Sequence, residues 1–335
     1  MKSSTLPATV LAALLAYAMG AAAMPGAKTG DHPKAGYPTQ VITIVVPFAA
    51  GGPTEAMARR LADALGRTLR ARVIVETVGG GGGTRGAERV ARARADGYTL
   101  LLHHAGHAAA PFLHRRLPYD PSKDFAPIGE IGNVPMTLIG RPELPAGFAE
   151  LKAWMRERGP AVRLGHAGPG SASHLCGLRL IDATETKPTA VTYKGTSRAI
   201  DALQKGNVDL LCDQTLNTVG PITAKRVRAY FIAGESRVPA LPETPTAGEA
   251  GAEGLNVLVW YGLFAPAATP QPVIAKLANA LQAAVKEFAL RDALQPFGVR
   301  VAGAAAATPD ALRERVTADM QRWRAASPGR ESARR

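Results

Sequence analysis

Short apolar runs alternate with segments of helical periodicity in the first third of the chain. The runs are VITIVVPF (41–48), RVIVET (72–77) and GYTLLLHH (97–104). Their β-branched residues and near-continuous hydrophobicity are typical of strands buried on both faces. Between the first two runs, apolar residues recur at every fourth position, which predicts a helix with one apolar stripe: Met57, Leu61, Leu65 and Leu69. A second helix is predicted over about residues 86–95, so the order of elements indicates a parallel sheet with right-handed crossovers.

A second series of the same kind follows. Its predicted strands are VRLGHAG (162–168), AVTYKG (190–195), VDLLCD (208–213) and VRAYFIAG (227–234). One helix is predicted from near Ser173, with Ser171 or Ser173 as its cap, and another ends at Leu203. Two more are predicted over about residues 270–290 and 308–324, and the last has Thr308 as cap and proline at its first position. Two apolar segments, IGNVPMTLIG (131–140) and LNVLVWYGLFAP (255–266), bracket this series.

These patterns predict an α/β protein of two lobes, each a mostly parallel sheet flanked by helices. The two bracketing segments cross between the lobes and form a hinge, which leaves a cleft between them. We assign residues 37–132 and 262–325 to a discontinuous lobe 1, residues 133–261 to lobe 2, and residues 326–335 to a flexible tail.

The N-terminus has the pattern of a secretory signal. Lys2 precedes an apolar run from Leu6 to Ala23, which ends in three alanines of the kind that signal peptidase cleaves after. The strongest part of the run is about a dozen residues, which is short for a membrane span. We interpret residues 1–23 as a signal peptide cleaved near Ala23; the alternative is an uncleaved anchor.

Export would allow the two cysteines to form a disulfide. Cys176 lies at the start of a predicted helix and Cys212 at the end of a predicted strand. Helix N-termini and strand C-termini share one edge of a parallel α/β layer, so a Cys176–Cys212 bond is geometrically reasonable. The alternative is a pair of buried thiols.

The charge balance favours anionic partners. The 335 residues include 40 Lys and Arg against 27 Asp and Glu, a formal net charge of +13. No nucleic-acid-binding motif accompanies this charge, and only 5% of the residues are aromatic, so we expect no nucleic-acid partner.

Five consecutive glycines follow the second predicted strand. Gly81, Gly83 and Gly86 formally match the dinucleotide-binding pattern, but His103 and His104 stand where that pattern needs an acid. The glycines also follow the second strand of the unit, whereas the pattern belongs to the first. No Lys-Ser/Thr pair follows them, as a P-loop would require. We therefore expect no nucleotide cofactor.

A carboxylate fits these glycines better. Glycine lets the backbone approach a ligand closely, and the unpaired N–H groups of a helix N-terminus carry partial positive charge. A second loop of this kind, AAGGPT (49–54), ends the first strand, with Thr54 as the predicted helix cap. Both loops lie at the sheet edge where open α/β folds bind ligands. They indicate a carboxylate site; the alternative is two tight turns without a ligand.

Six segments, in order, resemble the extracytoplasmic receptors of tripartite tricarboxylate transporters, the Bug-type binding proteins. They are YPTQVITIVVPFAAGGPTEAMAR, GGGGTRGAERVARARADGYTLLL, LPYDPSKDFAPIGEIG, GSASHLCG, YKGTSRAIDALQKGNVDLLCDQTLNT and PALPETPTAGEAG. The resemblance extends from Tyr37 to Trp323. It implies a type II periplasmic-binding-protein-like fold whose lobes close over a small organic acid in the periplasm.

The resemblance also implies that the protein delivers its ligand to membrane permease subunits, performs no chemistry and needs no cofactor. The expected ligand is a di- or tricarboxylate, an aromatic acid or an acidic amino acid, and we expect a monomer. The sequence leaves open a receptor of the same fold that signals to a membrane kinase.

The resemblance assigns ligand-binding residues by position. In lobe 1 they are Phe48, Ala49, Gly51, Gly52 and Thr54 in the first loop, Gly82, Gly83 and Thr84 in the glycine loop, and His107 after the third strand. In lobe 2 they are Ser171, Ser173, His174, Tyr193 with Lys194-Gly195, and Asp213. The sequence departs from the family at Arg85, where a small or apolar residue is usual, and at His166, where a small residue is common.

Enzymatic alternatives have weak support. Ser173 and His174 suggest a nucleophile with its base, but adjacent residues on a helix do not face one another, and no G-x-S-x-G motif is present. An exported hydrolase using Ser173 or His107 remains an alternative. His103 and His104 point to opposite faces of a strand, and no carboxylate with ligand spacing completes a metal site, so we expect no metal.

Three cleft assignments keep a structural alternative. Tyr193 is either a hydrogen-bonding group in the cleft or half-buried packing. Asp213 either orients a donor group or ligand amine, or pairs with a backbone N–H or with Lys194. Trp260 and Tyr261 lie in the second crossing segment, where we expect hinge packing rather than ligand stacking.

Overall fold

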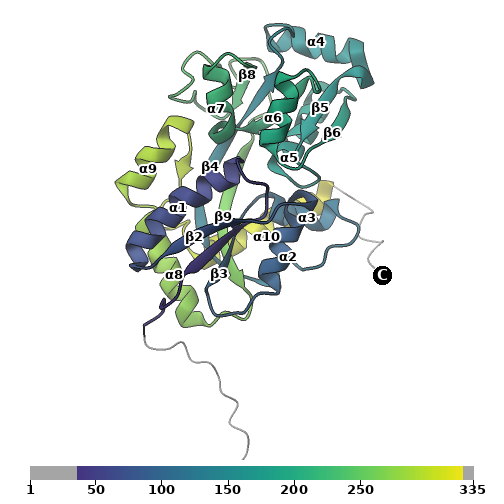
Figure 1. Cartoon of the computed structure of the whole chain (residues 1–335). Helices are drawn as coiled ribbons and strands as arrows, with labels where there is room; N and C mark the ends of the chain where they lie inside the picture. Colours follow the sequence, from purple (N-terminus) through teal and green to yellow (C-terminus); the bar gives the residue numbers. More distant parts are fainter. Residues whose placement is uncertain (1–35, 327–335) are drawn as a thin grey trace, which may run out of the picture.

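The computed structural model describes residues 36–326, so the predicted signal peptide and nearly all of the predicted tail lie outside the described residues. Within this range the sheet has ten strands: eight follow one hydrogen-bonded order, β2-β1-β3-β9-β4-β7-β5-β6, and the other two, β10 and β8, each pair with β4. Figure 1 shows the result: two lobes, one above the other, with β4 extending from one into the other.

Lobe 1 is built on the parallel strands β2, β1 and β3, to which β9 adds antiparallel. Its strands are β1 (Ile42–Val46), β2 (Val73–Thr77), β3 (Thr99–His104), β9 (Leu258–Pro266), the first part of β4 (Phe125–Gly140) and β10 (Arg300–Val301). Its helices are α1 (Pro53–Leu69), α2 (Thr84–Ala91), α3 (Gly106–Leu113), α8 (Gln271–Ala284), α9 (Phe288–Leu294) and α10 (Pro309–Ala326).

Lobe 2 repeats this plan with parallel strands β6, β5 and β7, and the second part of β4 pairs antiparallel with β7 and β8. Its other strands are β5 (Arg163–His166), β6 (Thr189–Thr192), β7 (Leu210–Gln214) and β8 (Arg228–Ala233). Its helices are α4 (Phe148–Arg158), α5 (Ala172–Thr184), α6 (Thr196–Gln204) and α7 (Thr215–Thr223), and short 3₁₀ turns occur at Gly81–Gly83, Gly159–Ala161 and Gln295–Phe297.

The two crossing segments are strands β4 and β9. They pair antiparallel from Phe125 opposite Pro266 to Pro135 opposite Leu258. The proposed lobe boundaries fall inside these strands and stay a prediction. The two-lobed α/β fold itself is confirmed, with antiparallel pairs added by the crossing strands.

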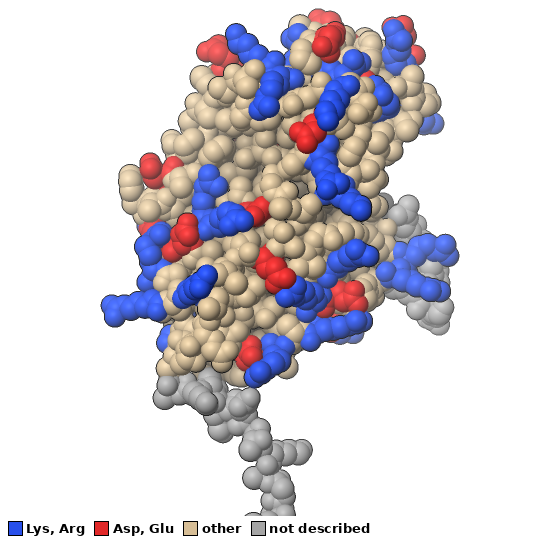
Figure 2. Space-filling model, in the orientation of Figure 1, with Lys and Arg blue, Asp and Glu red and all other residues tan. Residues whose placement is uncertain are grey.

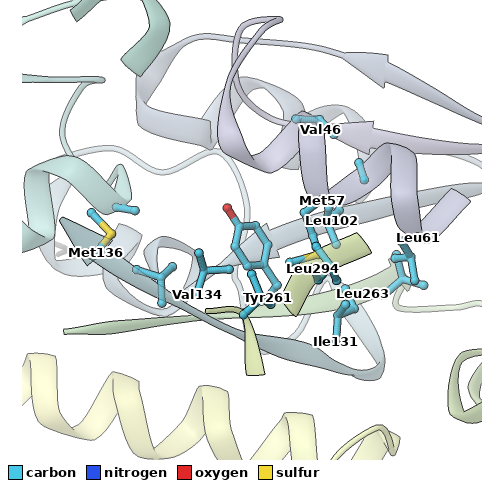
Figure 3. Close-up of a cluster of buried hydrophobic side chains, with 14 of the residues drawn as sticks. Val46, Met57, Leu61, Leu102, Ile131, Val134, Met136, Tyr261, Leu263 and Leu294 are labelled. Atoms are coloured by element: carbon cyan, nitrogen blue, oxygen red, sulfur yellow. The ribbon is translucent and has the colours of Figure 1, made fainter. Parts of the chain in front are cut away.

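The apolar stripe of the first helix faces the core as predicted. Met57, Leu61 and Leu65 are completely buried, and Leu69 is partly buried against the same cluster. In Figure 3, Met57 lies close to Leu102 of β3 and Leu294 of α9, which shows how the helices cover the lobe 1 sheet. This packing fixes the start of α1, and with it the loop that precedes the helix.

The predicted cap at Thr308 is confirmed, and of the two candidates for the start of α5 the cap is Ser171. The Ser171 hydroxyl accepts the His174 N–H at the start of α5, and the Thr308 hydroxyl accepts the Ala311 N–H at the start of α10. The prediction for Thr54 is wrong: α1 begins after Gly52 without a side-chain cap. The Thr54 hydroxyl instead lies 3.1 Å from the Tyr261 hydroxyl of β9.

The predicted disulfide is confirmed. Cys176 on α5 and Cys212 on β7 are bonded, with their Cα atoms 5.9 Å apart. In the part of the chain that the structure describes, no helix combines the length and the apolar character needed to cross a membrane.

Candidate functional site

Two connected spaces lie between the lobes. The outer groove has a volume of about 830 Å³ and is lined by Thr77, Gly79–Gly83, Arg85, Gly168, Pro169, Thr192, Tyr193, Lys194 and Arg198. The inner cavity has a volume of about 20 Å³, room for about one water molecule, and is lined by Gly52, Pro53, Thr54, His104, Ser171–Ser173, Thr196, Asp213 and Gln214. Phe48, Ala49, Ala167 and Gly195 line both spaces, so the two are continuous.

The loop between β1 and α1 forms one wall. The backbone N–H groups of Ala49 and Thr54 have no hydrogen-bond acceptor among the described residues. The Gly51 N–H differs, because it donates to the Glu55 carboxylate at 2.6 Å. Gly51 also lines neither space, and its carbonyl accepts a hydrogen bond from Ser197 of lobe 2. The N–H groups of Ala49 and Thr54, on either side of Gly51, are therefore free to bind a ligand.

The glycine loop forms the neighbouring wall and requires its glycines. Gly80 to Gly83 all have positive φ, between 59° and 134°. A Cβ on Gly82 would lie only 1.7 Å from the Pro169 carbonyl oxygen in lobe 2. A Cβ on Gly83 would lie 2.9 Å from His103 Nε2. Glycine thus permits a close approach between the lobes here, and the N–H groups of Gly81 and Gly82 have no acceptor among residues 36–326.

Lobe 2 contributes two hydroxyls held by the turn after β5. Ser173 Oγ accepts the Ala167 N–H at 2.9 Å, and Ser171 Oγ donates to the Gly168 carbonyl at 2.7 Å. His174 lines neither space; its Nδ1 accepts the Gly170 N–H at 3.3 Å. This arrangement gives Ser173 no histidine base and matches the role of a binding hydroxyl.

Asp213 is the one carboxylate at the inner cavity among the described residues, and it is fully buried. Asn217 donates to Oδ2 at 2.6 Å, whereas Oδ1 has no partner in the described part of the chain. Burial raises the pKa of Asp213 to about 6, against the opposing effect of hydrogen bonds from Asn217, the Gln214 backbone and Thr196. An unpartnered buried oxygen of this kind is costly unless a donor group reaches it.

The histidines divide between cavity and core. His104 lines the inner cavity, stacks on Phe48 with ring centroids 4.9 Å apart, and accepts the Gly106 N–H through Nδ1. Burial lowers its pKa to about 3, so it is neutral. His107 lines neither space: its ring is buried against Phe125 and Phe264, and burial lowers its pKa to about 4.

A hydroxyl on the crossing strand β9 connects both lobes behind the cavity. Tyr261 donates to Gln214 Oε1 of β7 at 2.8 Å, and its oxygen lies 3.1 Å from the Thr54 hydroxyl of α1. Figure 3 shows the Tyr261 ring among apolar residues with its hydroxyl pointing away from them. On the same strand, Trp260 donates to Asp319 of α10 at 2.6 Å. These contacts fix the relative position of Thr54 and Gln214.

The lobes also touch directly, so this is a closed conformation. His114 Nε2 of lobe 1 lies 3.2 Å from the Pro169 carbonyl of lobe 2, in addition to the Ser197–Gly51 contact.

The structure gathers most of the predicted site residues at the two spaces. Those that line them are Phe48, Ala49, Gly52, Thr54, Gly82, Gly83, Ser171, Ser173, Tyr193 and Asp213. Those that do not are Gly51, Thr84, His107 and His174. Lining residues that the sequence analysis did not assign include His104, Thr196 and Gln214. His104 and Gln214 are the last residues of their strands, and Thr196 is the first residue of a helix. Position at the end of a strand or the start of a helix was therefore the sequence signal that could have identified them.

Comparison with known proteins identifies the relatives of this chain. Residues 57–324 match the model of the tripartite tricarboxylate transporter family receptor. A protein of Agrobacterium vitis, described as the UPF0065 protein in the TAR-I ttuE-ttuC' intergenic region, is 42% identical over 287 residues, which cover 85% of this chain and 83% of the relative.

Two solved structures are similar throughout. The periplasmic binding protein BugD is 42% identical with a TM-score of 0.82, covering 87% of this chain and 97% of BugD. MatC from Rhodopseudomonas palustris, solved with bound malate, is 38% identical with a TM-score of 0.82, covering 87% of this chain and 100% of MatC. These relatives are binding receptors rather than enzymes. The chain therefore belongs to the tripartite tricarboxylate transporter receptor family and is a solute-binding protein of the Bug type.

Proposed function

We propose that this protein captures a small organic carboxylate in the cleft between its lobes and delivers it to the membrane permease of a tripartite transporter. The observation that carries this proposal is the convergence of two loops with free backbone amides on one interlobe space. The amides of Ala49, Thr54, Gly81 and Gly82 have no acceptor among the described residues, and a carboxylate satisfies such groups well.

The inner cavity narrows the ligand chemistry. Asp213 Oδ1 needs a hydrogen-bond donor, and the cavity holds only a small group. A hydroxyl, an ammonium group or one bridging water next to the ligand carboxylate meets both conditions. Malate, the ligand in the MatC structure, is an acid that carries such a hydroxyl.

The energetics are sufficient without a charged partner at the carboxylate. A micromolar Kd corresponds to about −8 kcal/mol. Charge-assisted hydrogen bonds contribute about 1.5–3 kcal/mol each before ordering costs, so several backbone amides supply this amount. Contacts between the ligand and lobe 2 would then favour the closed, ligand-bound state. Ser173 and Asp213 are the candidates for these contacts.

We further propose that the mature protein is a periplasmic monomer, released after cleavage near Ala23. The family match and the similarity to the periplasmic protein BugD support this location. Mass spectrometry of exported protein would identify the mature N-terminus, and light scattering would give its oligomeric state.

Titration calorimetry against di- and tricarboxylates, aromatic acids and acidic amino acids tests the ligand class. We expect at least one of these acids to bind with micromolar or lower Kd, and deletion of the gene to abolish uptake of that acid. If no acid in the set binds, or if uptake persists without the protein, the proposed function is wrong.

A further inference from the structure

Three cationic side chains surround the mouth of the outer groove. Arg85 comes from the first turn of α2 in lobe 1. In lobe 2, Lys194 comes from the loop between β6 and α6, and Arg198 from the first turn of α6. Arg85 lies back over the glycine loop, because its Cδ is only 2.6 Å from where a Cβ on Gly80 would be. The three charges therefore border the same groove, one from lobe 1 and two from lobe 2.

These charges are not neutralised by the protein. The lining of the outer groove contains no Asp or Glu among the described residues, and none of the three side chains forms an ion pair within residues 36–326. By contrast, the nearby Arg89 pairs with Glu76, close to the glycine loop. Figure 2 shows basic side chains on both lobes, including at the boundary between them.

Like charges on opposite lobes oppose closure unless an anion lies between them. The outer groove has ample room for such a group, since about 830 Å³ is within the range of sites that hold drug-sized ligands, whereas the inner cavity holds about one water molecule. The two spaces are continuous through Phe48, Ala49, Ala167 and Gly195, so one molecule can extend from the free amides to the cations.

We propose that Arg85, Lys194 and Arg198 form a second anionic subsite, and that the ligand is an extended organic acid with at least two anionic groups. One carboxylate contacts the two loops and the other lies between the three cations. This inference rests on the proposed function, which places the first carboxylate. The second group contacts both lobes only in the closed state, so it contributes directly to closure.

Matched ligand pairs test the subsite. The ligands are the straight-chain dicarboxylates from succinate to suberate and the monoamide of each, which keeps the length and removes one charge. The variants are the double substitution Arg85→Gln/Arg198→Gln and the control Arg72→Gln/Arg226→Gln. The control removes one exposed arginine from each lobe, and neither lines the groove. Thermal melting of each variant verifies folding.

We expect the best-fitting dicarboxylate to bind the wild type about 5–20-fold more tightly than its monoamide, because each exposed charge contributes about 2–5-fold. The double variant should lose most of this preference, the control should keep it, and added salt should reduce it. If monoamides bind as well as dicarboxylates, or if the double variant keeps the preference, the subsite is wrong while the proposed function stands. If nothing binds in this series or in the broader set of acids, both are wrong.

Discussion

Replacing Asp213 by asparagine should make the unliganded protein more stable at neutral pH. The carboxylate is fully buried, with Oδ1 unpartnered in the described part of the chain, so its charge is poorly compensated. Asparagine keeps an oxygen that can accept the Asn217 N–H and removes the charge. The substitution also removes an acceptor from the inner cavity, so we expect weaker ligand binding together with greater stability.

The magnitude follows from the pKa of Asp213, which burial raises to about 6 from an ordinary value of 3.8. The folded protein binds this proton more tightly than the unfolded chain does, so stability falls as the pH rises between these two values. At about 1.4 kcal/mol per pH unit, the cost of the charge above pH 6 is up to about 3 kcal/mol. Asp213→Asn should therefore raise the free energy of unfolding by about 1–3 kcal/mol at pH 8, and change it little at pH 4.

Urea unfolding of the wild type and Asp213→Asn at pH 4 and pH 8 measures this difference. Asp209 supplies a control of opposite sign. Burial alone would raise its pKa, but hydrogen bonds from Arg163 and the nearby Arg141 charge outweigh burial and lower the pKa. Asp209→Asn should therefore lose about 1–3 kcal/mol at pH 8. If Asp213→Asn is less stable than the wild type at pH 8, or gains equally at both pH values, then the carboxylate is not an uncompensated charge.

Three further changes test the closed structure. Gly82→Ala puts a methyl group against the Pro169 carbonyl and should weaken ligand binding at least about tenfold by calorimetry, whereas Gly254→Ala, also at positive φ but in open space, should not. Replacing both Cys176 and Cys212, 36 residues apart, by alanine should lower the urea-unfolding free energy by about 3–4 kcal/mol; no loss would contradict a structural disulfide. Tyr261→Phe should cost about 1–2 kcal/mol in the same assay, and unchanged stability would show that its two hydrogen bonds are dispensable.

Local patterns predicted the fold well because the spacing of apolar residues in this chain indicates which face of each helix or strand is buried. The stripe from Met57 to Leu65 and the runs that became β1, β2 and β3 were placed within two residues or so. Thr308 was predicted as a cap, and the choice at α5 was narrowed to Ser171 or Ser173, because a cap and its helix are adjacent in the sequence. The short helices α3, α4 and α7 were not predicted, because eight to eleven residues provide few turns of periodicity.

The site was predicted less completely, because position in a loop does not determine which way a group faces. Thr54 was expected to cap α1, but its partner Tyr261 is 207 residues away in the sequence, and such contacts leave no local signal. The Gly51 amide is taken by Glu55, one helical turn later. His107 follows the third strand as expected, but aromatic residues from β4 and β9 enclose its ring.

The shared strand β4 has a consequence for how tightly the protein holds its ligand. Its 16 residues run from one lobe into the other: those up to Pro135 pair with β9, and those from Met136 on pair with β7 and β8 of lobe 2. The lobes are therefore joined by paired strands rather than by two single loops. We expect opening to deform these paired strands together, at an energetic cost that depends on their stiffness. Part of the ligand affinity would then depend on strand residues that line neither space.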